Sequence, residues 1–381
     1  MNSGDRRSVL LSLGYACIIL VLAQIMSNMI IGSRDSSVPQ YFLHGFLSHT
    51  EVIPPLARWD SIWYYAISQY GYGFSIGTWE AKAGFFPLYP IVVRIVAQLF
   101  GLNIFWAGII ASICCTAVAL VFLSRYLKLR FDVTESEAEY IQFIYLCSPA
   151  ALILVSAYSE AMFIMLVVVG LWARANNRTW LCFIVFFLAG LTRLHALAFA
   201  CAIFMDAIYF SWRLKKVQVG KILDGVSVIT GVGAFFGYLW LKFGDPFHYL
   251  NVKQKHWGNM NGDFFLNWQS SILGGLSTTP NFAGLMNLAD NFLPLLYGVV
   301  LIWLWRREYI LEAGIIIFVI LMSVVGGSFW GFSRYSLVLF SALVILRPLS
   351  HYRSGYYLSI PLIAIQYCFL FQFVFTLLPA P

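Results

Sequence analysis

The sequence predicts an all-α polytopic membrane protein with about eleven transmembrane helices. Two observations support this fold class. First, the 381 residues are 60% hydrophobic and 11% charged, with a mean hydropathy of +0.78, whereas an ordinary globular domain is about 25% charged. Second, many apolar runs approach the roughly 20 residues that a spanning helix needs. This composition excludes a soluble enzyme, a disordered protein and a nucleic-acid-binding protein.

The N-terminal run shows how the spans are assigned. A basic flank precedes about 23 mostly apolar residues, and no cleavable signal pattern is present, so this run is expected to stay as a spanning helix. The same criterion is applied along the rest of the chain. The predicted spans are residues 8–31, 103–124, 139–157, 160–174, 179–192, 195–211, 222–242, 289–305, 309–327, 335–347 and 355–378.

Residues 87–101 form an apolar run that we expect not to span. The run has Arg94 near its middle, and as a helix it rises only about 22 Å, against an apolar core of roughly 30 Å. If it lies at the outer face as an interfacial or re-entrant helix, 15 of the 24 basic residues fall on one side, as the positive-inside rule requires. The N-terminus is then inside and the C-terminus outside. The clusters are Arg6/Arg7, Arg125/Lys128/Arg130, Arg174/Arg178, Arg213/Lys215/Lys216/Lys221, Arg306/Arg307 and Arg347/Arg353.

The chain is predicted to be a single integral membrane domain, residues 1–381, with two long outer loops. Residues 32–102 form the first, which carries the interfacial helices, and residues 243–288 form the second. The inner loops are short, so the outer face has more room for a site. The seven cysteines all lie in apolar runs without a CxxC motif, which argues against a disulfide framework or a zinc site.

The most informative motif is ARWDSIWYYAISQYGYGF, residues 57–74, in the first outer loop. Its apolar residues have helical spacing, and Trp and Tyr favour the membrane interface, so we expect a short helix on the membrane surface. Asp60 would be partly desolvated there, as suits a general base for an alcohol. An ion pair with Arg58 that only anchors the loop is an equal alternative. Trp59, Trp63 and Tyr64 are candidate substrate-binding residues.

Two further acids are catalytic candidates. Glu80 lies in EAKAGFFPLYP, where it could also be an ordinary solvated charge, and Glu160 lies in SAYSEAMF at an outer junction of two spans. Arg193 and His195 lie in LTRLHAL at another outer junction. A charge this close to the bilayer needs a partner or a function. Either Glu160 and Arg193 pair to hold helices together, or Arg193 binds a phosphate with His195 beside it.

Basic residues also gather in the second outer loop, against the topological rule. The segment GDPFHYLNVKQKHWG contains the substrate-binding candidates Lys253, Gln254, Lys255, His256 and Trp257, and cations retained on this side suggest an anionic ligand. Ordinary loop charge remains the alternative for each residue singly. A further candidate, Arg334, precedes a span in SRYSLVLF. Acids and cations at a lipid–water boundary suggest chemistry on a lipid-linked phosphate.

Six ordered segments then identify a resemblance. The chain resembles the glycosylphosphatidylinositol mannosyltransferase II family, more closely its prokaryotic branch, within the GT-C superfamily of multispanning glycosyltransferases. In LTRLHAL, Leu194 stands where relatives often have Pro or Ser, which leaves the role of His195 open. The matching segments are RWDSIWYYAISQYGY, FFPLYPIVVRIVAQLFG, SAYSEAMF, LTRLHAL, GDPFHYLNVKQKHWG and SRYSLVLF.

The resemblance implies a GT-C-like bundle that moves a hexose, with mannose favoured, from a polyprenyl-phosphate donor to a lipid or glycan acceptor on the outer face. It implies inversion at the anomeric carbon, with Asp60 as the general base. Arg193, Arg334 and the Lys253/Lys255 pair would stabilise the phosphate. Glu80 and Glu160 would orient Asp60, bind acceptor hydroxyls or hold a metal. No cofactor is required, although a divalent metal is compatible with this scheme.

Three alternatives stay open at this point. The chain could be a flippase or transporter of lipid-linked sugars, a non-catalytic binding subunit, or an outer-face enzyme that transfers another sugar or a phospholipid head group. Short inner loops argue against the transporter, and Asp60 argues against the binding subunit. The expected location is the plasma membrane in a prokaryote and the endoplasmic reticulum in a eukaryote, with membrane lipid around the bundle.

Overall fold

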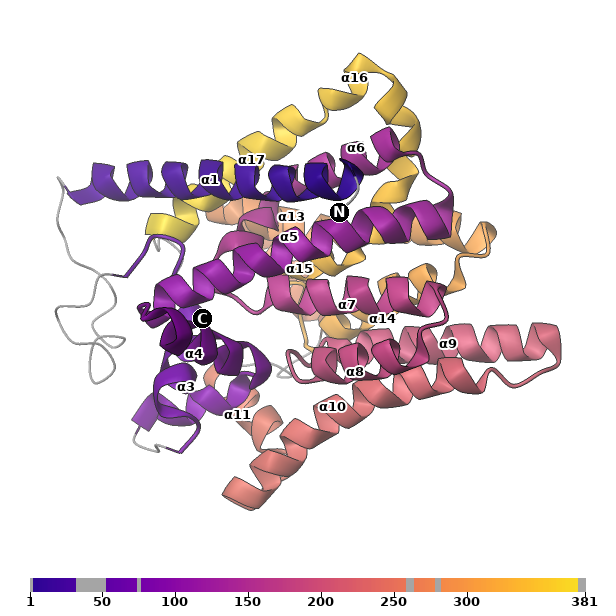
Figure 1. Ribbon diagram of the computed structural model, residues 1–381. Helices are drawn as coiled ribbons and strands as arrows, with labels where there is room; N and C mark the ends of the chain where they lie inside the picture. Colours follow the sequence, from indigo (N-terminus) through magenta and orange to yellow (C-terminus); the bar gives the residue numbers. More distant parts are fainter. Residues whose placement is uncertain (1–2, 32–52, 74–76, 258–263, 278–281, 376–381) are drawn as a thin grey trace.

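The computed structural model describes residues 3–31, 53–73, 77–257, 264–277 and 282–375. Within these ranges the protein is helical and contains no strand. The long helices lie side by side in one bundle (Figure 1). The elements are α1 (Ser3–Ile31), α3 (Ser61–Tyr70), η1 (Gly77–Gly84), α4 (Leu88–Phe100), α5 (Ile104–Phe131), α6 (Glu135–Cys147), η2 (Pro149–Val155), α7 (Glu160–Ala175), α8 (Thr179–Gly190), α9 (Ala196–Leu214), α10 (Val219–Phe243), α11 (His248–Trp257), α12 (Phe264–Ser277), α13 (Phe282–Arg306), α14 (Ile310–Val325), α15 (Phe332–Tyr335), η3 (Ser336–His351), α16 (Arg353–Tyr356) and α17 (Ser359–Phe375).

The multi-pass class predicted from the sequence is confirmed, with fewer full-length spans than the eleven expected. In the described part of the chain, seven helical segments are long and apolar enough to cross a membrane, and a bent pair makes up to eight. That pair is α6 and η2, which meet at 92° within the predicted span 139–157. The seven are Ser3–Met29, Ile104–Phe131, Ala196–Leu214, Val219–Phe243, Asn287–Arg306, Phe332–His351 and Arg353–Val374.

Three other predicted spans are helices that stop short. Helices α7 and α14 have 16 residues each and α8 has 12, so they rise about 18–24 Å. At the same end of the bundle, α7 begins at Glu160, α8 ends at Gly190 and α14 ends at Val325. The irregular segments beside these ends line a cavity, for example at Thr192 and Gly326. Helices α7, α8 and α14 are therefore short at the end where the adjoining irregular segments line the cavity.

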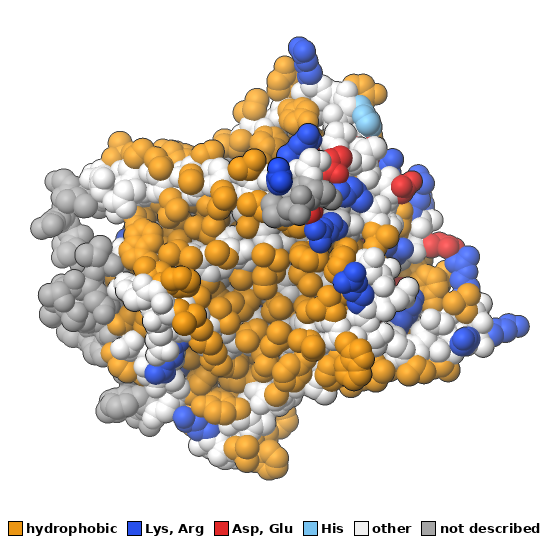
Figure 2. Space-filling model, in the orientation of Figure 1, with side chains coloured by type: hydrophobic (Ala, Val, Ile, Leu, Met, Phe, Trp, Pro, Cys, Tyr) orange, Lys and Arg blue, Asp and Glu red, His pale blue; other side chains and the backbone are white. Residues whose placement is uncertain are grey.

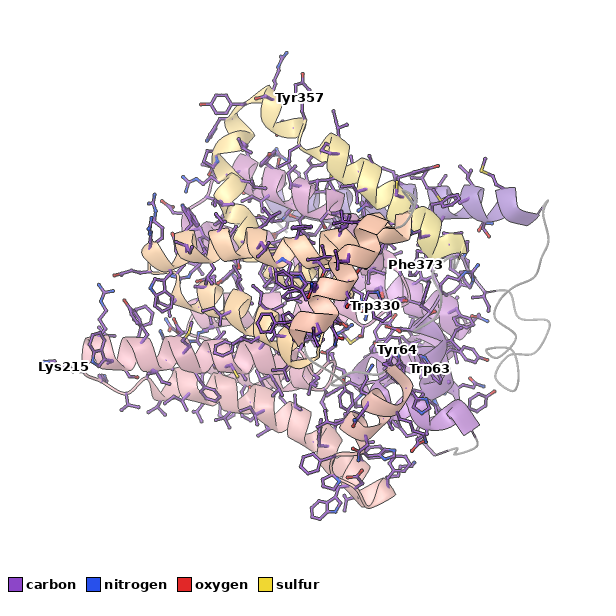
Figure 3. All side chains as sticks on the ribbon, turned by 180° about the vertical axis from the view of Figure 1, so that it is seen from behind. Trp63, Tyr64, Lys215, Trp330, Tyr357 and Phe373 are labelled. Atoms are coloured by element: carbon purple, nitrogen blue, oxygen red, sulfur yellow. The ribbon has the colours of Figure 1, made fainter. Side chains whose placement is uncertain are left out.

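The basic clusters gather at one end of the bundle, which we call the basic end. Figure 2 shows apolar side chains over the broad middle of the molecule and most of the visible charged side chains at this end. Lys215, between α9 and α10, lies at the opposite end from Trp63 and Tyr64 (Figure 3). The predicted segregation of basic residues is thus present, and the other end, with α3, η1, α4 and α11, is called the cavity end.

Ion pairs connect neighbouring helices at the basic end. Arg174 of α7 donates to Asp206 of α9 at 2.7 Å and to Asp224 of α10 at 2.9 Å, and all three side chains are less than 10% exposed. Arg130 of α5 donates two hydrogen bonds to the buried Glu312 of α14, at 2.7 and 3.0 Å. These five residues form what we call the basic-end network, in which Arg174 joins α7, α9 and α10 and Arg130 joins α5 and α14.

At the cavity end, the first outer loop folds onto the bundle. Residues 32–52 and 74–76 of this loop lie outside the described residues, as do 258–263 and 278–281 of the second. The helix expected in residues 57–74 is present as α3, but seven of its ten residues are buried against the protein instead of lying on a surface. In α4, by contrast, the apolar residues Ile91 and Leu99 are exposed, as suits a helix at the interface.

Candidate active site

A cavity of about 590 Å³ opens at the cavity end. Its charged part is lined by Asp60, Arg193, Lys253 and Arg334, which come from four separate segments of the chain. The labelled Tyr64, Trp330 and Phe373 lie around this region in Figure 3. Of the site residues predicted from the sequence, the lining contains Trp59, Asp60, Tyr64, Arg193, His195, Lys253, Trp257 and Arg334.

Asp60 is placed by an unusual backbone turn. It is the N-cap of α3, and the preceding Trp59 has a φ of 55°, a left-handed conformation that an L-residue adopts only when its surroundings enforce it. The Tyr158 hydroxyl supplies that constraint, because it donates to the carbonyl of Arg58 at 3.1 Å and accepts from the Asp60 N–H at 3.3 Å. The Asp60 carboxylate is thereby held at the cavity wall, 22% exposed.

A chain of alternating charges runs behind Asp60. Arg334 donates from Nη1 to Asp60 Oδ2 at 2.9 Å, and its Nε lies 3.0 Å from Oε1 of Glu160. The same Glu160 oxygen lies 2.6 Å from Nη1 of Arg193. Glu160 is only 4% exposed and does not line the cavity. The structure therefore brings the predicted Glu160–Arg193 pair together and adds Arg334 as the link to Asp60.

Only one oxygen of the Asp60 carboxylate is used by this chain. Oδ2 accepts the Arg334 hydrogen bond, and no described residue donates a hydrogen bond to Oδ1. Glu160 forms ion pairs with two guanidinium groups and lies outside the cavity lining. Asp60 is thus the carboxylate with free acceptor capacity toward the cavity, which a general base requires.

Lys253 contributes a cation that no described carboxylate pairs with. Its ammonium lies 4.8 Å from the ring centroid of Phe85 and 4.1 Å from that of Trp257. Burial lowers the pKa of Lys253 to about 8, opposed by the negative charge of Asp60 and assisted by Arg334 and Arg193. A half-buried cation that contacts aromatic faces and has no carboxylate partner among the described residues favours an anionic ligand.

His195 and Tyr64 complete the polar wall as neutral groups. The His195 ring lies against Tyr335, with centroids 4.3 Å apart, and burial together with the charges of the neighbouring arginines holds its pKa well below the usual range. The Tyr64 hydroxyl is hydrogen-bonded to Ser159 Oγ at 2.7 Å, and burial raises its pKa. Neither side chain adds charge to the cavity at neutral pH.

The other predicted site residues lie outside the lining. Lys255 donates to Glu80 at 2.6 Å, and His256 Nε2 is 3.9 Å from the same carboxylate. This exposed pairing holds the pKa of Glu80 below its ordinary value. Arg58 donates to the backbone of residues 53 and 54 instead of pairing with Asp60. Trp63 and Gln254 also lie outside the lining.

Asp290 and Ser333 line the cavity but were not predicted from the sequence as site residues. Asp290 of α13 accepts hydrogen bonds from the backbone N–H groups of Gly331 and Ser333, at 2.6 and 2.7 Å, and from the Ser333 hydroxyl. The residue after Ser333 is Arg334, so this buried carboxylate fixes the start of the helix that carries it. The acidic residue at position 290, inside the predicted span 289–305, could have indicated this role from the sequence.

The cavity also has an apolar arm between α9 and α14. The two helices touch at Gly314, where an added Cβ would lie 3.2 Å from Cα of Ala202. Toward the cavity end, Cys201, Leu321 and Val325 line the space between them. Leu321 and Val325 are also 45% and 67% exposed on the apolar surface. The arm therefore joins the charged part of the cavity to the side of the bundle that would face lipid.

No group of three or more His, Cys, Asp and Glu side chains suited to a metal ion occurs in the described part of the chain. The cations and the apolar arm that line the cavity give it the form of a site for an amphipathic anion, with a carboxylate at its wall, in a multi-pass membrane protein.

A comparison with known protein families identifies the family to which this membrane protein belongs. Residues 9–236 match the family described as "Mannosyltransferase (PIG-V)", and the chain belongs to that family. The match covers Asp60, Glu160 and Arg193, whereas Lys253 and Arg334 lie beyond it. No curated protein matches the chain. The protein is therefore a membrane glycosyltransferase of a mannosyltransferase family, with a sugar donor and an acceptor as its substrates.

Proposed function

We propose that the protein transfers a mannosyl group from a polyprenyl-phosphate donor to a hydroxyl of a lipid or glycan acceptor, with inversion at the anomeric carbon. The proposal places the cavity end on the non-cytoplasmic side, because the basic clusters lie at the other end. In a prokaryote this is the outer face of the plasma membrane. The reaction belongs to the GT-C type that the sequence resembles.

The observation that carries the proposal is the polarity of a single cavity. Asp60 and three cations line one part of it, and an apolar arm between α9 and α14 leads from there to the lipid-facing surface. A polyprenyl phosphate has the same division, with a charged head group and a long apolar tail. The arm accommodates the tail, and the cations Arg193, Lys253 and Arg334 lie where the phosphate would be.

The proposed step needs one base and no general acid. Oδ1 of Asp60 takes the proton of the acceptor hydroxyl as its oxygen attacks C1 of the sugar. The bond between C1 and the phosphate oxygen breaks, and its electron pair leaves with the polyprenyl phosphate. The cations stabilise the charge that develops on this leaving group. Asp60 then releases its proton to water, which restores the base.

The test compares the wild-type protein with Asp60→Asn. Both full-length proteins are purified in nanodiscs and incubated with polyprenyl-phosphate mannose, with and without a membrane lipid extract as acceptor. Release of polyprenyl phosphate is measured. We expect acceptor-dependent release by the wild type and a loss of about 10²–10⁴-fold in Asp60→Asn. Equal thermal unfolding of the two proteins serves as the folding control.

Other outcomes discriminate between the remaining functions. Full turnover in folded Asp60→Asn would move the base to Glu80 or Glu160. Turnover only with another donor sugar would retain the transferase and replace mannose. Specific binding of the lipid without turnover of several donors would favour the flippase or the binding subunit.

A further inference from the structure

Three aromatic side chains form a compact group beside the charged part of the cavity. Trp63 of α3 stacks on Phe85 with centroids 6.1 Å apart. Trp257 of α11 meets both of them edge-on, at 6.2 Å from Trp63 and 5.6 Å from Phe85. Phe85 and Trp257 line the cavity, whereas Trp63 supports them from behind. These three residues are called the aromatic group.

The faces that this group turns to the cavity are covered by Lys253, whose ammonium lies over both Phe85 and Trp257. Gly84 makes this packing possible, because a Cβ there would lie 3.2 Å from the Trp257 ring and 3.3 Å from Cε of Lys253. The side chain of Lys253 is flexible, and the ring faces attract a cation less strongly than a phosphate does.

We propose that Phe85 and Trp257 form the subsite for the pyranose ring of the donor, and that Lys253 covers this subsite until a phosphate draws its ammonium away. The C–H face of a pyranose is weakly positive and flat, so it packs on the electron-rich face of an aromatic ring. The inference rests on the proposed function and specifies which side chains recognise the sugar.

The position of the aromatic group favours a sugar over the lipid tail. Phe85, Trp257 and Asp60 line the same cavity, so the aromatic faces and the proposed base are open to one ligand. The tail has its own apolar arm between α9 and α14. A ring bound over Phe85 and Trp257 would lie beside Lys253 in the same cavity as Asp60, so its C1 could be near both the phosphate-binding cations and the proposed base.

The test measures binding of two lipids to the full-length protein in nanodiscs: polyprenyl-phosphate mannose, and a sugar-free polyprenyl methyl phosphate of the same chain length, which has the same phosphodiester charge. We expect the wild type to bind the mannosyl lipid about 5- to 10-fold more tightly, in the range of one aromatic contact. Trp257→Leu should reduce this ratio to about one, because the contact with the sugar is lost. Trp257→Tyr, which retains a flat ring, should keep most of the ratio.

Gly84→Ala provides a second variant that changes no aromatic residue. Its added Cβ presses on Trp257 and Lys253, so the ratio should fall several-fold. Trp212→Leu is the matched control, because Trp212 is 79% exposed on α9 and distant from the cavity lining.

The failures of the two proposals are distinguishable. A wild type that turns over the mannosyl donor but binds both lipids equally overturns the sugar subsite and leaves the transferase. The subsite is equally overturned if Trp257→Leu and Gly84→Ala both keep the wild-type ratio. A wild type that neither turns over the mannosyl donor nor binds it selectively overturns the proposed function as well.

Discussion

Both ends of the bundle contain buried carboxylates beside arginines, but the two ends arrange them differently. In the basic-end network, Arg174 donates to Asp206 and Asp224, and both oxygens of Glu312 accept from Arg130. None of these residues lines the cavity. At the cavity end, Asp60 has an oxygen without a donor and Lys253 has no carboxylate partner among the described residues.

The difference separates charges that hold helices together from charges that are available to a ligand. The charges of the basic-end network pair with one another outside the cavity, whereas Asp60 and Lys253 line the cavity, where an oxygen of the one and the ammonium of the other are available to a ligand. The ion pairs of the basic-end network also argue against a transport function. A transporter would have to open the basic end, which requires separating helices that the basic-end network joins.

The largest expected effect is on stability, at the basic end. Arg174→Met leaves the buried Asp224 without the cation that pairs with it and leaves Asp206 with Lys221 alone, so unfolding should become easier by about 3–5 kcal/mol. Thermal unfolding of the purified protein measures this change. The turnover of the folded fraction should equal that of the wild type. A large loss of turnover in folded Arg174→Met would contradict the assignment of this end to structure.

The matched substitution at the cavity end is Arg334→Met. It should change the free energy of unfolding less than Arg174→Met does, but it should lower kcat strongly. Arg334→Met removes the cation that contacts Asp60 and Glu160, and kcat should fall about 10²–10³-fold. The loss of stability should be smaller than in Arg174→Met, because Glu160 keeps Arg193 at 2.6 Å. Equal kcat in the two variants would remove the distinction between the ends.

Asp290 should show an intermediate effect, because it acts on Arg334 and not on the substrate. Asp290→Ala leaves three donors at the start of the Arg334 helix without their acceptor, and kcat should fall about tenfold while the donor KM changes little. Asp290→Asn keeps an oxygen for Ser333 and should restore part of the loss. If Asp290→Ala raised KM alone, a role in binding would replace the positioning role.

The smallest effect is a pH dependence of donor binding. Because the pKa of Lys253 is about 8, its ammonium is largely charged at pH 7 and largely neutral at pH 9. The donor KM should therefore rise several-fold over this interval. Lys253→Arg stays charged, so its donor KM should be flat over the same range. A wild-type KM that is already flat would show that Lys253 does not contact the phosphate.

The sequence predicts the class of fold well, because length and hydropathy decide whether a helix spans. It predicts the count of spans less well, since the 92° bend between α6 and η2 and the early ends of α8 and α14 depend on cavity packing. Hydropathy alone carries no signal for such tertiary constraints. The α3 helix was expected on the membrane surface because its Trp and Tyr residues favour the membrane interface. Aromatic residues are equally suited to packing inside the protein, where α3 in fact lies.

For the site, charge in an apolar context was the useful signal. Asp60 was expected from the aromatic-rich helix of the first outer loop, and Arg193 and Arg334 because each lies at the end of a span; all three line the cavity. Lys255 and His256 share a segment with Lys253 but pair with Glu80 outside it, since neighbours on a helix point in different directions. Phe85 and Asp290 were not singled out, because their contacts come from partners distant in sequence.

The ion pair between Asp60 and Arg334 joins residues that are 274 positions apart. A ribosome adding about 5–20 residues per second needs roughly 15–55 s to cover that interval. During this time the first outer loop has left the ribosome, while the arginine that fixes its acid has not been made. The ion pair therefore forms only after Arg334 has been made, and a chain terminated before that residue has Asp60 without the cation that contacts it.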